Sequence, residues 1–209
     1  GVQTCALPIS KDDETFIVYS EKFIEGEDVR ELIENDFFSD RGKLVKLLLE
    51  VTRAIKVYWD NFKIVHRDVK PENIRLSSSN DKFVLLDAGI AYIKDRTKLT
   101  LTGQLSPGTP PYKSPEHIKG TNPSFRTDLF CLAVVVYEAA TQEHPFVEVG
   151  MSTREMNEAI LNKEPKALHL IDSNIPIELS ELVSRMLEKR QHMRPNNLQN
   201  IINTLEELS

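Results

Sequence analysis

The sequence is poor in the features that mark secreted, membrane-spanning and metal-cage proteins. Only two of its 209 residues are cysteines, Cys5 and Cys131, which are too few for a disulfide framework and favour a reducing compartment. The five histidines are scattered, with no pair at metal-ligand spacing. The longest apolar run, 129–140, is too short to span a bilayer, and no basic segment followed by an apolar one stands at the start. We therefore expect a cytoplasmic protein with no membrane segment in this chain.

An excess of negative charge argues against nucleic acid as a partner. The chain has 26 Lys and Arg residues against 32 Asp and Glu residues, a formal net charge of −6. An acidic surface repels phosphate backbones, so no nucleic acid partner is expected. The length suffices for one substantial core or at most two small domains.

The first nine residues, Gly1–Ile9, look like the translation of a common sequencing adapter in one frame. We therefore expect residues 1–10 to be a library artefact that lies outside the fold. The alternative is a natural loop, which the composition permits. A native in-frame codon series at the locus would exclude the artefact.

Hydrophobic periodicity predicts a fold of class α+β, mostly α. A β-branched and aromatic run at 15–19 is typical of a strand, and Asp28 is placed to cap a helix that runs to about Phe38. Two more short strands are expected around 74–76 and 82–86. The remaining helices are predicted over 42–62, 125–141, 152–162, 177–189 and 196–208.

The predicted helix 42–62 has one apolar face, which we expect to be buried. The residues of this face are Leu44, Leu47, Leu48, Val51, Ile55, Tyr58, Trp59 and Phe62. Residues 88–114 differ from this pattern, because they are rich in Thr, Ser, Gly and Pro and have no clear periodicity. So long an irregular stretch in a compact domain is usually functional or disordered.

The segment His66–Asn73 reads His-Arg-Asp-Val-Lys-Pro-Glu-Asn, and it resembles the catalytic loop of protein kinases. The resemblance implies that Asp68 accepts the proton of a substrate hydroxyl and orients it for attack. It also implies that Lys70 offsets charge on the transferred phosphoryl group and that Asn73 holds magnesium. Lysine at position 70 is similar to serine/threonine kinases rather than tyrosine kinases. The alternative is a charged surface turn.

The sequence Asp87-Ala88-Gly89 follows the strand expected at 82–86 and resembles the magnesium-binding Asp-Phe-Gly motif of the same family. Asp87 would then chelate the metal that bridges the ATP phosphates, since magnesium prefers hard carboxylate oxygens. Alanine at position 88 replaces an aromatic side chain that normally packs behind the metal site. How this kinase switches between active and inactive packing therefore stays open. In isolation, Asp-Ala-Gly is only a turn signal.

The segment 108–116 resembles the end of a kinase activation segment, with Ser-Pro-Glu where many members have Ala-Pro-Glu. The resemblance implies that Thr109 bonds near Asp68 and Lys70. It also implies a structural ion pair between Glu116 and Arg194, although a solvated charge is the alternative for the arginine. Such a pair, when buried, is costly to break from one side.

Further residues receive structural or regulatory roles from the resemblance. Asp128 is expected to accept hydrogen bonds from the backbone of the loop that contains His66 and Arg67. Kinases with an arginine before the catalytic aspartate commonly order the activation segment by phosphorylation. The preferred acceptors here are Thr100 and Thr102, although each can equally be a polar loop residue.

The resemblance covers nearly all of the chain from residue 15 onward and implies a division into three parts. Residues 1–10 would be the artefact, 11–25 a remnant of the N-lobe strand and hinge, and 26–209 the helical C-lobe. A glycine-rich phosphate loop, a Val-Ala-Ile-Lys strand and a glutamate-bearing helix are missing from the 209 residues.

The resemblance also implies which residues bind the nucleotide. The backbone near Lys22 and Ile24 would meet adenine, while Lys70 and Asp87 would bind the phosphate and metal end. Arg75 falls where the family usually has an aliphatic residue under the adenine ring. Its methylene stem could cover the ring while the charged head reaches water.

The implied function is a serine/threonine kinase that uses ATP and Mg²⁺ and acts on Ser/Thr acceptors of protein substrates. We expect the complete parent to be active and this N-terminally truncated fragment to be inactive. One alternative is a pseudokinase scaffold. The alanine at 88, the arginine at 75 and the missing lobe leave room for it, whereas the intact His-Arg-Asp, Asn73 and Asp87 argue against it. Another is a small-molecule phosphotransferase, which would typically lack the Lys-Pro-Glu-Asn run found here.

Overall fold

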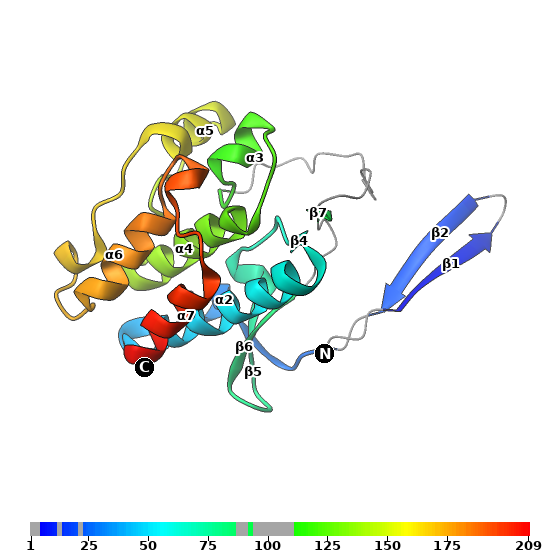
Figure 1. Cartoon of the computed structure of the whole chain (residues 1–209), viewed down its shortest axis with the longest axis horizontal. Helices are drawn as coiled ribbons and strands as arrows, with labels where there is room; N and C mark the ends of the chain where they lie inside the picture. The colour runs from blue at the N-terminus through cyan, green and yellow to red at the C-terminus, as the bar shows by residue number, and fades with distance from the viewer. Residues whose placement is uncertain (1–4, 12–13, 21–22, 87–91, 94–110) are drawn as a thin grey trace.

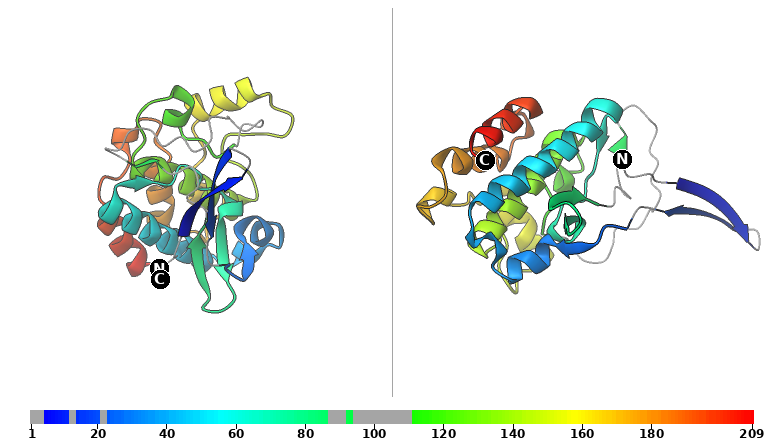
Figure 2. Two further views of the ribbon diagram at one scale, coloured as in Figure 1. Left: turned by 90° about the vertical axis from the view of Figure 1, so that its right-hand side faces the viewer. Right: turned by 90° about the horizontal axis from the view of Figure 1, so that it is seen from below.

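The structure is a computed structural model that describes residues 5–11, 14–20, 23–86, 92–93 and 111–209. Its helices pack into one body, and a two-stranded hairpin extends from that body (Figures 1 and 2). The strands are β1 (Cys5–Lys11), β2 (Glu14–Ser20), β3 (Gly26–Asp28), β4 (Ile64–Val65), β5 (Ile74–Ser77), β6 (Lys82–Leu85) and β7 (Tyr92–Ile93). The helices are α1 (Val29–Glu34), α2 (Gly42–Phe62), α3 (Pro115–Lys119), α4 (Phe125–Thr141), α5 (Thr153–Asn162), α6 (Ile177–Met186) and α7 (Leu198–Glu207). The fold class is α+β, with helix predominating, as the periodicity predicts.

The strands form three small antiparallel sheets. β1 pairs with β2, β4 pairs with β7, and the third sheet has the order β3-β5-β6. The predicted strand at 15–19 corresponds to β2. The sequence analysis sets residues 1–10 outside the fold, whereas Cys5–Lys11 forms the strand β1. Two strands can pair whether their residues are natural or come from a sequencing adapter. The pairing of β1 therefore does not test the adapter hypothesis, which stays a prediction.

Asp28 starts α1 by a reciprocal capping box. Its Oδ1 accepts a hydrogen bond from the Glu31 backbone N–H at 3.0 Å, and Glu31 Oε2 accepts one from the Asp28 N–H at 3.0 Å. The helix ends at Glu34, so the predicted extension to Phe38 is wrong. The chain adopts a left-handed conformation at Asp36 (φ 55°) and then forms a 3-10 turn that buries Phe38 completely.

α2 has the predicted bounds and buries most of its predicted face. The buried members are Leu44, Leu47, Leu48, Val51 and Ile55. Phe62 is an exception, because 59% of it is exposed. The last turns of the helix instead pack Trp59 against Phe125, with ring centroids 5.2 Å apart, and place Tyr58 beside His66.

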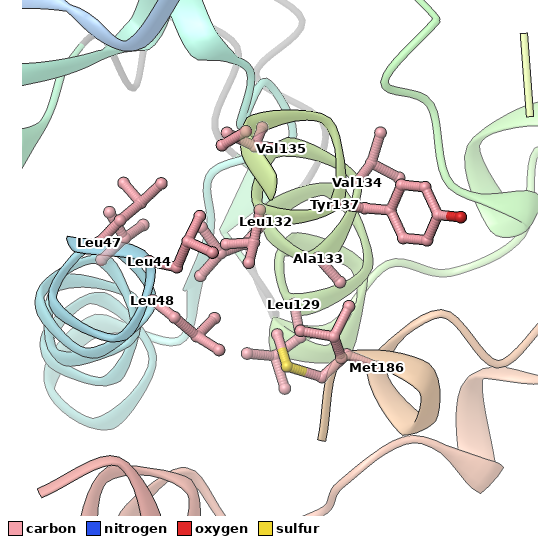
Figure 3. Packing of buried hydrophobic residues seen from close by; sticks show 14 of the residues in the cluster. Leu44, Leu47, Leu48, Leu129, Leu132, Ala133, Val134, Val135, Tyr137 and Met186 are labelled. Carbon is pink, nitrogen blue, oxygen red and sulfur yellow. The ribbon is translucent and has the colours of Figure 1, made fainter. Parts of the chain in front are cut away.

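α4 is the central helix of the core and also has its predicted bounds. Its middle, Leu129–Tyr137, is buried throughout, as expected for a helix surrounded by others. Figure 3 shows Leu44 and Leu48 of α2 pointing toward it, and Met186 of α6 lying beside Leu129. Of the helices in the described ranges, none has both the length and the apolarity needed to cross a membrane.

The other helices differ from prediction mainly at their ends. α6 stops at Met186 rather than at 189, and Arg194 donates to the carbonyls of Glu188 and Lys189 just beyond its end. α5 and α7 begin one and two residues later than predicted, at side-chain caps from Ser152 and Asn197. The sequence analysis missed α3, since five residues are too few to show a helical period.

Candidate active site

The loop between β4 and β5 brings three predicted side chains to one point. Lys70 Nζ lies 2.8 Å from Asp68 Oδ2. Asn73 Nδ2 donates to the same oxygen at 2.8 Å and to the Asp68 backbone carbonyl, also at 2.8 Å. Asn73 stands at the end of a 3-10 turn (Pro71–Asn73), and its N–H bonds the Lys70 carbonyl at 3.0 Å. The loop therefore gathers a carboxylate, an ammonium and an amide over six residues.

The two bonds from Asn73 fix the orientation of its amide group. Both Asp68 atoms are acceptors, so the donor nitrogen must face them. The carbonyl oxygen of the Asn73 side chain, Oδ1, therefore points away from Asp68. Hard oxygens of this kind are what Mg²⁺ prefers, so the arrangement of Asn73 fits its predicted role as a metal ligand.

Asp128, in the first turn of α4, anchors the start of the loop. Its Oδ2 accepts from the His66 backbone N–H, and its Oδ1 from the Arg67 N–H, both at 2.9 Å. Burial raises the pKa of Asp128 to about 7, although both backbone donors favour the charged form. Arg67 has a left-handed backbone (φ 71°), which is strained for a residue other than glycine and is held here by these bonds.

His66 joins the loop to the strand that precedes Asp87. The ring Nε2 of this fully buried histidine lies 2.9 Å from the Leu86 carbonyl oxygen. On the other side, the Leu86 N–H donates to the Asn73 carbonyl at 2.8 Å. Leu86, one residue before Asp87, therefore lies beside the loop that contains Asp68. The sequence indicated a structural role for His66 but not its partner.

Glu116 and Arg194 form the ion pair that the resemblance implies. Arg194 Nη1 and Nη2 reach the two carboxylate oxygens at 2.7 and 2.9 Å, and both side chains are buried. Burial alone would raise the pKa of Glu116, but the hydrogen bonds and charge of Arg194 outweigh it and lower the pKa to about 2. The sequence analysis missed Gln191, whose Nε2 donates to Glu116 Oε1 at 3.2 Å and to Thr127 Oγ1 at 3.1 Å.

A second cluster, centred on Arg30 of α1, was also missed. Arg30 Nη1 lies 2.8 Å from Glu138 Oε1, Nε lies 3.1 Å from Glu72 Oε1, and Nη2 donates to the Tyr112 hydroxyl. Tyr112 in turn donates to Glu138. Burial and the Glu138 charge raise the pKa of Tyr112. The cluster joins α1, the catalytic-loop turn, the segment before α3 and α4. No feature of the sequence pointed to this cluster.

The structure also brings together Ile24 and Arg75, two of the residues predicted to bind nucleotide. Arg75 Nη1 donates to the Ile24 carbonyl oxygen at 3.2 Å. The other predicted residues Lys22, Asp87, Thr109, Thr100 and Thr102 lie outside the described residues, and their roles stay predictions.

The helices pack around the buried central helix α4, and the loop with Asp68, Lys70 and Asn73 is hydrogen-bonded to that helix through Asp128. This arrangement defines a protein of the kinase class. Residues 6–205 match the sequence model of the family described as protein kinase domain. The chain therefore belongs to the protein kinase domain family. The match begins within β1, so it includes the hairpin and does not confirm that the chain is a C-lobe alone.

Curated relatives are bacterial serine/threonine-protein kinases. The chain is 30% identical to pkn3 of Myxococcus xanthus over 184 residues, which are 83% of this chain and 33% of that protein. It is 30% identical to a probable serine/threonine-protein kinase of Clostridium perfringens over 202 residues, 95% of this chain and 28% of that protein. It is likewise 30% identical to PknB of Mycobacterium leprae over 174 residues, which are 83% of this chain and 27% of that protein. The chain thus spans about a third or less of the length of these relatives.

Proposed function

We propose that the protein transfers the γ-phosphoryl group of ATP to serine or threonine hydroxyls of protein substrates. The observation that supports this most directly is the convergence of Lys70 and Asn73 on Asp68. Family membership supports the kinase class. The lysine at position 70 and the names of the relatives support Ser/Thr rather than Tyr acceptors.

Asp68 has the geometry of a group that orients and deprotonates a substrate hydroxyl. The bonds from Lys70 and Asn73 end on Oδ2, so within the described part of the chain Oδ1 is left to accept the hydroxyl hydrogen. The proton passes to Asp68 as the hydroxyl oxygen bonds to the γ-phosphorus and the bond from that phosphorus to the bridging oxygen breaks, which releases ADP. Lys70 holds the carboxylate in place and offsets charge that develops on the transferred group.

Asn73 and Asp87 are the residues proposed to hold magnesium. Asn73 offers Oδ1, because its amide nitrogen is engaged by Asp68. Asp87 follows Leu86, which is tied to Asn73 and His66. When bound, Mg²⁺ neutralises charge on the ATP phosphates.

The remaining nucleotide and regulatory roles belong to the same proposal. The backbone at Lys22 and Ile24 meets the base, and Thr109 helps to position the substrate hydroxyl near Asp68. Phosphorylation of the activation segment, at Thr100 or Thr102, orders it through Arg67.

We also propose that residues 11–25 are the end of an N-lobe and that 26–209 form the C-lobe of a longer kinase. A glycine-rich loop and its strand lysine are not part of the 209-residue sequence. Those elements cover ATP and grip its phosphates in this family. The 209 residues alone are therefore expected to show no turnover.

Transfer of labelled phosphate from ATP to Ser, Thr and Tyr peptides tests the proposal on the full-length natural protein. Asp68→Asn should lower kcat by about 10²–10⁴-fold, because the proton acceptor is lost. Asp60→Asn is the matched control on α2, where Asp60 pairs only with Lys56 among the described residues. Full activity in Asp68→Asn would refute the assignment.

Two other outcomes separate the alternatives. A full-length protein that binds ATP without transferring phosphate would indicate a pseudokinase scaffold. Turnover by the 209-residue chain that depends on Asp68 would contradict the proposed truncation.

A further inference from the structure

A hollow of about 390 Å³ lies between α3, the end of α5 and the segment 189–192 that follows α6. α3 and α5 lie next to each other at one end of the body (Figure 1). All of the walls of the hollow belong to the range 111–209, which the structure describes without a gap. The volume falls within the roughly 300–1,000 Å³ that ligand sites occupy. None of the residues that line it belongs to the loop around Asp68, so the hollow is separate from the candidate active site.

Positive side chains dominate the walls of this hollow. Lys119 comes from α3, and Lys189 and Arg190 come from the segment after α6. The only carboxylate in the lining, Glu116, is already bound by both terminal nitrogens of Arg194. A cleft lined by charges of one sign concentrates the electrostatic potential inside it. The hollow therefore favours an anionic ligand.

Lys189 is held in place within the wall. Its Nζ donates to the Ile160 carbonyl oxygen at 2.8 Å and lies 3.6 Å from the centre of the Phe146 ring. Burial lowers the pKa of Lys189 to about 8, although the charges of Glu164 and Glu188 oppose this shift. The ammonium group thus keeps its charge at pH 7 but is poorly hydrated, and an anion in the hollow would stabilise it.

Lys119 and Arg190 stand at the exposed rim and are placed to close on a ligand. Neither forms an ion pair with another residue of the described ranges. A guanidinium binds two oxygens of a phosphate at once, and an ammonium adds a point charge beside it. Together with Lys189, the two side chains match the charge of about −1.5 to −2 and the three oxygens of a phosphorylated side chain. A carboxylate has only one charge and two oxygens.

We propose that this hollow binds the phosphate group of a phosphorylated serine or threonine side chain of a protein. Lys119 and Arg190 hold the phosphate oxygens, and Pro115 and Leu161, which also line the hollow, contact the carbon atoms of the phosphorylated residue and its neighbours. The volume exceeds that of a single phosphate, which favours an anion carried by a polypeptide. The inference goes beyond the proposed function, because binding here requires no phosphoryl transfer at Asp68.

Fluorescence anisotropy of a labelled peptide, Ala-Ala-phosphoserine-Ala-Ala, tests the site on the full-length natural protein without ATP. The same peptide with serine or glutamate in place of phosphoserine should bind at least about tenfold more weakly. Lys119→Ala and Arg190→Ala should each weaken the phosphopeptide by about fivefold, and the double variant by about 25-fold. Arg154→Ala is the matched control on α5, because Arg154 pairs with Glu158 and does not line the hollow.

Three results would overturn the proposal. An unchanged affinity in the double variant, or an equal loss in Arg154→Ala, would show that the peptide binds elsewhere or through general charge. Equal binding of the glutamate peptide would remove the preference for phosphate. Inorganic phosphate that competes as tightly as the peptide binds would exclude a polypeptide ligand. Each of these failures is distinct from a failure of the kinase assignment, because no turnover is measured. Lys119→Gln and Arg190→Gln replace the alanine variants if urea denaturation shows that those do not fold.

Discussion

The ion pair between Glu116 and Arg194 leads to a quantitative prediction for the substitution Glu116→Ala. The Arg194 guanidinium is fully buried and uses all five of its N–H donors. Two of them bind Glu116, and the other three bind the backbone carbonyls of Glu188, Arg126 and Lys189. Removing the carboxylate leaves two buried donors and a guanidinium that stays charged, because arginine is not deprotonated in proteins. We expect a loss of about 3–5 kcal/mol in the free energy of unfolding.

Urea denaturation at pH 7 measures this loss, and a double-mutant cycle assigns it to the pair. Arg194→Met alone leaves the Glu116 carboxylate buried without its partner, so it should also be costly. The double variant removes both charges and should be less destabilised than the sum of the singles, with a coupling energy of about 2–3 kcal/mol. A cost below about 1 kcal/mol for Glu116→Ala, or simple additivity, would refute the reasoning.

The same pair predicts a pH dependence with a definite sign. Arg194 lowers the pKa of Glu116 from 4.5 to about 2 in the folded state, so this stabilisation is complete above pH 4.5 and is lost as the pH falls through 2. At pH 3 about 2 kcal/mol of the contribution of Glu116 to the free energy of unfolding should be lost. Burial raises the pKa of Asp128 from 3.8 to about 7, which changes stability in the opposite direction over a higher range. The stability of the natural protein is therefore compared with that of Glu116→Gln. The difference between their free energies of unfolding should be about 2 kcal/mol smaller at pH 3 than above pH 4.5.

Three further substitutions, with Val57→Ala as a control, test the packing and the loop anchors. Leu132→Ala in the centre of α4 should cost about 2–5 kcal/mol in urea denaturation, whereas Val57→Ala on the exposed side of α2 should change stability by less than about 0.5 kcal/mol. Asp128→Asn turns an amide N–H toward a loop N–H and should lower stability by about 1–3 kcal/mol in the same assay. Arg30→Met removes the group that joins α1 to Tyr112, so amide hydrogen exchange should accelerate in the segment before α3 without a comparable change in α7.

Local sequence patterns predicted much of the fold correctly. The bounds of α2 and α4 follow from their apolar periodicity, and the cap at Asp28 follows from its side-chain chemistry. The errors lie at the ends of elements, because the apolar periodicity of a helix does not fix its last residue. α1 stops at Glu34, before the left-handed residue Asp36 and the 3-10 turn that buries Phe38, and α6 stops at Met186.

The candidate site shows the same division. The sequence of the loop named Asp68, Lys70 and Asn73, because their types and spacing are encoded within six consecutive residues. It also supplied Asp128, Glu116 and Arg194 through the order of the family motifs. It gave no sign of the hollow lined by Lys119 and Arg190 or of the Arg30 cluster, because both bring together residues far apart in the sequence, as much as 108 positions in the Arg30 cluster.

What the sequence alone determined is thus the set of chemical groups and the helices that hold them, since both depend on neighbours along the chain. Tertiary structure decided which atom of each group is free to act. The amide of Asn73 is turned by Asp68, and all five donors of Arg194 are consumed by carbonyls and a carboxylate from three other segments. The bonds of Arg194 to Glu116 and Arg126 join residues 78 and 68 positions apart, a distance over which no local pattern of residues encodes a contact.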